Sequence, residues 1–190
     1  MALALLLGNS GCAAATPPRG VAAAPPNAAA SCLPGERGFF QASLRGALEA
    51  KPDWRGAQLQ CTGGARPDAR GLRLSFGATL PNSKHTLRIV FGIAVAPGVL
   101  RSAAVPANIT VIVEGEHRIY STLGDDKCTV EALVQEQLPQ SKDYRIAARG
   151  FCTAPAVAVG GTERLYIDRF DFAGRAQLED QDLDVQTTTL

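Results

Sequence analysis

The sequence predicts an all-β domain, an antiparallel β-sandwich or small barrel of seven to eight strands held by two disulfides. Three observations lead to this prediction. Apolar residues recur at every second position through much of the chain after residue 71, turns containing Gly or Pro separate these stretches, and no long stretch has an unambiguous helical period.

Composition limits the classes of protein to which the chain can belong. Its 190 residues are enough for one domain, or for one domain with a tail. The 19 basic and 18 acidic residues give a formal charge of +1, which argues against nucleic-acid binding. With 46% hydrophobic residues the chain can form a core, and no apolar run approaches the roughly 18 residues of a membrane-spanning helix.

The first residues contain a short apolar run, Ala2–Leu7, followed by Ser10, Gly11 and Cys12. Small residues before a cysteine resemble the signal peptide of bacterial lipoproteins, although Asn9 replaces the usual aliphatic residue. The resemblance implies that the signal is removed and that Cys12 is lipidated. No Lys or Arg precedes the run, so we expect the true start upstream of Met1. The alternative is an ordinary secretory signal, with Cys12 left as a spare thiol.

An Ala- and Pro-rich stretch follows up to Ser31. Its paired prolines, Pro17-Pro18 and Pro25-Pro26, favour an extended conformation, which suits a spacer between a membrane and a folded domain. Ala13 stands where an Asp would direct a lipoprotein to the inner membrane. The resemblance therefore implies an anchor at the periplasmic face of the outer membrane.

Of the five cysteines, four remain once Cys12 is assigned to the lipid. An even number of cysteines in an exported domain predicts two disulfides. No Cys-x-x-Cys pair supports redox or zinc chemistry. Three pairings are possible. We favour Cys32–Cys61 and Cys128–Cys152, because both pairs are close in sequence and the second fits a hairpin register.

The segment 39–50 fits both a helical stripe and strict alternation, and Gly46 favours the strand. Pro52-Asp53 is then the turn into a strand near 57–61. In the next hairpin, with a turn at Pro81-Asn82-Ser83, we expect the pairs Ala78–Leu87, Phe76–Ile89 and Leu74–Phe91.

The residues 96–107 are interpreted as a long connection. A second hairpin joins 109–113 to 118–123 through the loop 115–117. This three-residue loop predicts the pairs Val113–Ile119, Val111–Ser121 and Glu114–Arg118.

A third hairpin pairs 128–138 with 144–152, with Cys128 opposite Cys152. Its register places one mostly apolar face toward the core, through the pairs Val130–Gly150, Ala132–Ala148, Val134–Ile146 and Glu136–Tyr144. The other face, with Glu131, Gln135 and Arg149, suits solvent, and Leu133 is an exception to this pattern.

The last strand, 164–172, changes parity between Ile167 and Phe170, which predicts a bulge near Asp168 or Arg169. We expect this strand to pair with an early one and close a sheet edge. An acidic, flexible tail follows. The predicted boundaries are a signal peptide at 1–11, lipidated Cys12 and a linker at 12–31, the β domain at 32–175, and the tail at 176–190.

Familiar motifs for nucleophilic catalysis, phosphate binding and zinc hydrolysis do not occur. His85 and His117 lie in turns, and a metal site would need His117 with Asp125 and Asp126. We interpret these as solvated turn residues. Asp168 and Asp171 are interpreted as strand residues, Trp54 as a core residue or a sugar-stacking one, and the sequon at Asn108 as a chance match.

The sequence thus predicts an exported, lipid-anchored protein with a non-catalytic interaction or assembly domain. It predicts no enzyme activity, no cofactor and no metal; the expected partners are the membrane and an envelope protein. The alternative is a domain that binds a small sugar or apolar molecule.

Overall fold

The computed structural model describes residues 32–68, 70–80 and 85–178. Signal peptide, Cys12, linker, the turn at 81–83 and the tail from 179 lie outside them. The described residues form twelve strands, more than expected, and the extra ones are short: β1 Phe39–Gly46, β2 Asp53–Arg55, β3 Gln60–Ala65, β4 Leu72–Thr79, β5 Thr86–Ile93, β6 Arg101–Ser102, β7 Val105–Glu114, β8 Arg118–Ser121, β9 Cys128–Gln137, β10 Asp143–Cys152, β11 Ala156–Ala158 and β12 Arg164–Gln177.

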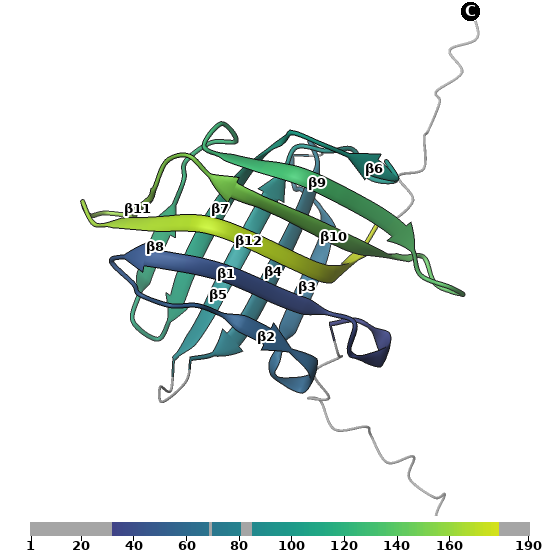
Figure 1. Ribbon diagram of the computed structural model, residues 1–190, viewed down its shortest axis with the longest axis horizontal. Coiled ribbons are helices and arrows are strands. Elements are labelled where there is room, and N and C mark those ends of the chain that lie inside the picture. The colour runs from purple at the N-terminus through teal and green to yellow at the C-terminus, as the bar shows by residue number, and fades with distance from the viewer. Residues whose placement is uncertain (1–31, 69, 81–84, 179–190) are drawn as a thin grey trace, which may run out of the picture.

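The strands form two layers whose directions cross steeply (Figure 1). One layer contains β2, β1, β12, β10, β9 and β6, and the other contains β3, β4, β5, β7, β8 and β11. β7 turns the corner between them, because Val105–Ala107 pair with β9 and the rest of the strand pairs with β5 and β8. β11 makes a second link, between β8 and β12. The all-β prediction is confirmed, as a barrel-like sandwich.

Aromatic rings fill the space between the two layers. Phe40, Phe170 and Phe172 point inward from β1 and β12, and Phe76 and Phe91 meet them from β4 and β5. The ring centroid of Phe172 lies 4.8 Å from those of both Phe76 and Phe91. All five rings are buried. Such ring pairs stabilise a core beyond the apolar area that they remove from water.

The ambiguous segment 39–50 is a strand, β1, as favoured from its sequence. It pairs with the last strand, β12, as expected. The strand predicted near 57–61 is wrong in its position, because Gly56–Gln58 form a 3₁₀ turn and β3 begins at Gln60. The positive φ of Gly56 starts this turn.

The β4–β5 hairpin has the predicted register, with Phe76 opposite Ile89 and Leu74 opposite Phe91. In the β7–β8 hairpin the predicted register is wrong by one residue. Val113 pairs with Arg118 and Val111 with Tyr120, so Tyr120 is buried.

The cause of this shift is the loop between β7 and β8. Between the last paired residues, Val113 and Arg118, the connection has four residues rather than three, because Glu114 does not pair with β8; Gly115 and His117 have positive φ. Glu114 then faces Thr86 of β5, and its carboxylate bonds to Arg88 instead of Arg118. The long connection expected at 96–107 is also wrong in its extent. It is shorter, because β6 lies within this range and β7 begins at Val105.

The β9–β10 hairpin follows the predicted register only near its disulfide. Cys128 faces Cys152 and Val130 faces Gly150, but Arg149 then faces Ala132, so Glu131 is the extra residue of a bulge. The predicted pairs Ala132–Ala148, Val134–Ile146 and Glu136–Tyr144 are therefore wrong.

The same bulge explains the exception at Leu133, which lies in the core, 1% exposed. It also buries Gln135, which we expected in solvent. The Gln135 side-chain amide donates to the carbonyl of Ala96, and its oxygen accepts from the amide of Gly98. These bonds satisfy the buried side chain and fasten the loop before β6.

The predicted bulge in the last strand is confirmed. Ala42 faces Phe170 and Leu44 faces Ile167, so Ser43 faces two residues of β12, Asp168 and Arg169. The strand is longer than expected and continues to Gln177. Leu178 is buried, so the packed domain extends past the predicted boundary at 175.

Both disulfides have the predicted pairing. Cys32–Cys61 links the segment before β1 to β3, and Cys128–Cys152 closes the open end of the β9–β10 hairpin. Their cysteines are separated by 29 and 24 residues respectively.

Reduction of both disulfides is expected to lower the free energy of unfolding by about 3–4 kcal/mol for each bond, because the unfolded chain regains loop entropy. Thermal melts with and without a reductant measure this loss, and EDTA serves as the control, with no expected change. A melting temperature that falls with EDTA but not with the reductant contradicts the prediction.

Gly150→Ala is expected to destabilise the fold by at least about 2 kcal/mol, because a Cβ there lies 2.1 Å from the Thr129 carbonyl oxygen and 2.6 Å from Phe170 Cζ. The control is Gly77→Ala in β4, where the nearest atom is the movable Arg88 guanidinium at 3.3 Å. We expect less than about 1 kcal/mol there. Equal losses in chemical denaturation of the two variants contradict this account.

Candidate functional site

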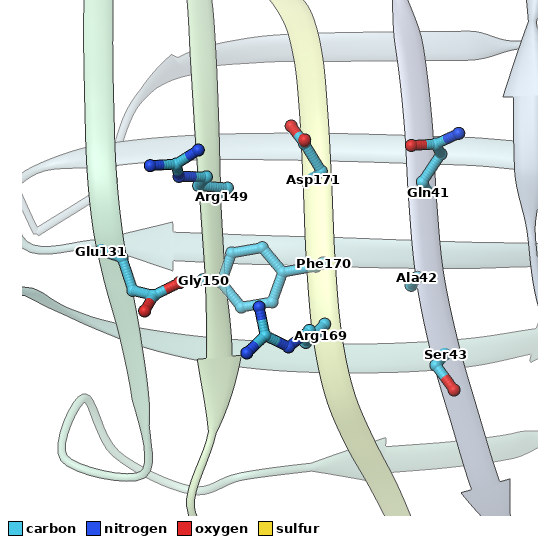
Figure 2. A pocket seen from close by; sticks show the side chains of 9 residues that line it. All are labelled: Gln41, Ala42, Ser43, Glu131, Arg149, Gly150, Arg169, Phe170 and Asp171. Carbon is cyan, nitrogen blue, oxygen red and sulfur yellow. The ribbon is translucent and has the colours of Figure 1, made fainter.

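A shallow pocket lies on the outer face of the layer formed by β1, β12, β10 and β9, where both bulges occur (Figure 2). Its volume is about 390 Å³. We call it the bulge pocket; it is lined by Gln41, Ala42, Ser43, Glu131, Arg149, Gly150, Arg169, Phe170 and Asp171. Bulges change the direction of side chains and often lie next to binding sites.

The rim of the bulge pocket is set by strand register. Asp171 lies directly between Gln41 of β1 and Arg149 of β10. Opposed residues in a sheet have Cβ atoms about 5 Å apart, so these three side chains are immediate neighbours. Burial raises the pKa of Asp171, and the charge of Arg149 opposes this shift without cancelling it.

The floor of the pocket contains small residues. Gly150 has no side chain, and the buried Phe170 ring lies close beside it, 2.6 Å from where a Cβ would stand. Figure 2 shows the ring beside Gly150, with Glu131 and Arg169 around it. The Phe170 ring itself is only 2% exposed, so the charged side chains surround a floor made mainly of strand backbone and small residues.

The two acids singled out in the last strand are separated by the bulge. Asp168 accepts two hydrogen bonds from the guanidinium of Arg45, both 2.6 Å long, and these bonds lower its pKa. Only Asp171 lines the pocket. The two acids both belong to β12, as expected, and they have different environments.

Trp54 is a core residue, as favoured from the sequence. It is 5% exposed, and its ring centroid lies 5.2 Å from that of Phe40. One edge lines a separate recess under the loop 48–53. With so little of the ring in solvent, the face that a sugar would stack on is covered.

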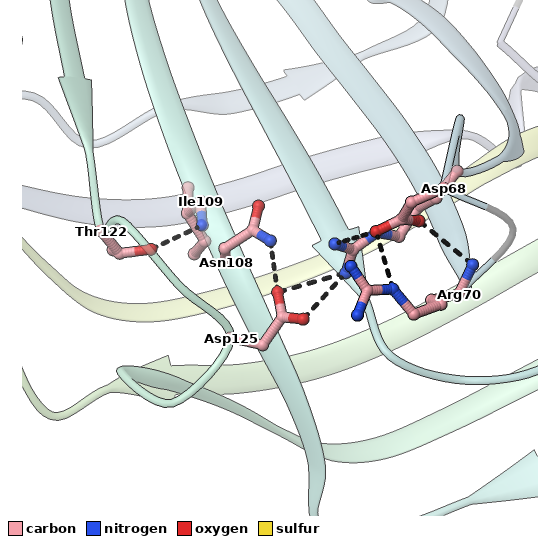
Figure 3. A network of polar contacts seen from close by, with 7 residues as sticks. Asp68, Arg70, Asn108, Ile109, Thr122 and Asp125 are labelled. Atoms are coloured by element: carbon pink, nitrogen blue, oxygen red, sulfur yellow. Dashed lines mark hydrogen bonds and ion pairs between the residues drawn. The ribbon is translucent and has the colours of Figure 1, made fainter.

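Asp125 belongs to a network at one end of β7 (Figure 3). Its carboxylate accepts hydrogen bonds from Arg66 at 3.1 Å and from the side-chain amide of Asn108. Burial lowers the pKa of Arg66, but its bonds to Asp125 and Asp68 outweigh burial and the pKa is raised. Asn108, the sequon residue, is thus engaged in a hydrogen bond.

The residues that a metal site would need do not come together. His117 lies at the tip of the β7–β8 hairpin, whereas Asp125 lies beside Asn108 at the opposite end of β7. Near the tip, the Nδ1 atom of His85 lies 2.9 Å from the carboxylate of Glu116. Within the described ranges, no group of three or more His, Cys, Asp or Glu side chains is placed to hold a metal ion.

Sequence reasoning missed the pocket residues on β1, β9 and β10. Arg149 and Glu131 were placed on a regular solvent face, and a regular face has no pocket. One signal was present, because Leu133 did not fit the predicted register of β9. Together with the parity change near Asp168, it indicated two bulges.

The described residues include no helix with the length and hydropathy needed to cross a membrane. No protein family, curated protein or solved structure matched the chain. Its function is therefore argued from its own residues and geometry.

Asp125→Ala is expected to lower the free energy of unfolding by about 1–2 kcal/mol, because Arg66 and Asn108 lose a charged acceptor. Asp126→Ala, at the exposed neighbouring residue, is the control, with an expected change within about 0.5 kcal/mol. Urea denaturation measures both variants. The account of the network is wrong if the two variants unfold at the same urea concentration.

Proposed function

We propose that this chain is an exported lipoprotein, anchored at the periplasmic face of the outer membrane through Cys12. Its β domain serves there as a non-catalytic interaction or assembly module for an envelope protein. The proposal includes no cofactor and no nucleic acid.

The observation that carries the proposal is the pair of disulfides. Disulfides persist in oxidising compartments, and they are rare in reducing ones. Both bonds hold the domain that follows the Ala- and Pro-rich stretch, and each uses cysteines other than Cys12. Cys12 is thus left over for the lipid that its preceding residues suggest.

The packing of the domain supports a surface role. Aromatic rings fill the space between the layers, so a partner would be recognised from outside. On that outside, arginine and carboxylate side chains alternate across neighbouring strands, as in the pairs Arg45–Asp168 and Arg145–Glu136. Charges of both signs favour specific, oriented contact with a protein over general attraction to one sign of charge.

Cys12→Ser is expected to abolish acylation, so that the protein stays unprocessed or is released in soluble form. The control is Ser10→Ala, which keeps a small residue before Cys12. Intact mass and detergent-phase partitioning of the full chain, expressed in a bacterium, measure both variants. A wild-type chain without an acyl group overturns the anchor.

The interaction role is tested separately by crosslinking intact envelopes and purifying the wild-type chain. One envelope protein recovered in stoichiometric amount supports the module. Recovery of bulk lipid alone overturns it.

A second candidate function, binding of a small ligand, is favoured by the bulge pocket. Its charged rim and the small residues Ala42 and Gly150 form one concave surface.

A further inference from the structure

We propose that the bulge pocket binds a small zwitterion, an amino acid or short peptide whose carboxylate pairs with Arg149 and Arg169 and whose ammonium group faces Asp171 and Glu131. The inference deepens the second candidate function, because it names the ligand class. It does not depend on acylation of Cys12.

The first argument is the state of the two arginines. In the described part of the chain, eight arginines form ion pairs with carboxylates. Arg149 and Arg169 are exposed. Within the described residues, neither of them forms a hydrogen bond or an ion pair. Both line the same pocket. Guanidinium groups that lack a bonded partner at one concavity are suited to a carboxylate ligand, which they can bind with paired hydrogen bonds.

The second argument is the charge balance of the rim. Two cations, Arg149 and Arg169, stand with two acids, Glu131 and Asp171, so the pocket has little net charge. A simple anion would meet both acids at short range, which costs binding energy. A ligand with a positive group beside its carboxylate avoids this cost and uses all four side chains.

The third argument is the floor. Gly150 and Ala42 have little or no side chain, so ligand atoms can approach the strand backbone between the charged groups, and Ser43 and Gln41 add hydroxyl and amide groups at one side. A small ligand can therefore lie close to the sheet while its polar groups bond to the rim. The volume of about 390 Å³ lies within the usual range for small-molecule sites.

The geometry also explains why the site needs both bulges. Without the extra residue Glu131, the parity of β9 would not change at the pocket. Ile167 and Phe170 both lie in the core, although strict alternation would place them on opposite faces. Without the extra residue of β12, alternation from Ile167 would turn Arg169 and Asp171 inward. The two irregularities bring the four charges to one place.

The test uses the purified full chain and three probes: L-alanyl-L-alanine, its N-acetyl derivative and its C-terminal amide. Amide shifts in a ¹⁵N spectrum measure affinity and location. We expect saturable binding of the dipeptide, with shifts at the pocket strands. Both derivatives are expected to bind at least about tenfold more weakly, because each lacks one charge.

Arg149→Gln and Arg169→Gln are each expected to weaken binding of the dipeptide about tenfold or more. The control is Arg164→Gln, an exposed arginine of the same strand as Arg169 that does not line the pocket. Spectra of all variants report whether the fold is kept. Unchanged affinity in both pocket variants, or an equal loss in the control, overturns the site.

Absence of saturable dipeptide binding overturns the proposal while leaving the acylation and crosslinking results as they stand. Equal binding of the amide overturns the role of the two arginines. Equal binding of the N-acetyl derivative overturns the zwitterion, because it removes the contribution of Asp171 and Glu131.

Discussion

The contact of the Phe172 ring with Phe76 and Phe91 holds the two layers together, and much of the fold depends on it. β12 carries Phe172 and is paired along its length with β1 and β10, so its position fixes those strands as well. The contact also requires space. Gly174 gives it on β12, because a Cβ there would lie 2.7 Å from the Phe76 ring. The packing of the aromatic rings therefore requires a glycine at position 174 of β12.

Alternation of apolar residues predicted strand pairing well where both strands are regular and only one register joins their apolar faces. In β4 and β5 both strands are regular, and one register alone joins their apolar faces, so the pairing followed from the sequence. In β7 and β8 the apolar residues allowed two registers. The choice depended on the backbone of Gly115 and His117, and the tolerance of His117 for positive φ is not visible in an apolar pattern.

The candidate site was harder to predict than the fold. Motif searches look for residues close in sequence, whereas the pocket is lined by residues of four strands, β1, β9, β10 and β12. Arg149 and Asp171 are 22 positions apart and meet only through the register of β10 and β12. The bulge at Asp168 was predicted because the large apolar residues change parity between Ile167 and Phe170. The bulge at Glu131 was not, because Leu133 alone indicated it.

The Cys32–Cys61 bond has a mechanical consequence. A pulling force applied to the chain ahead of Cys32 reaches β3 through the sulfur atoms, as well as β1 through the backbone. Without this bond, tension would unzip β1 from β12 one residue at a time, starting at Phe39. With the bond, part of the load passes to β3, which is paired with β4 over its whole length. The redox state of this one covalent bond therefore decides whether a load at this end is shared between two strands.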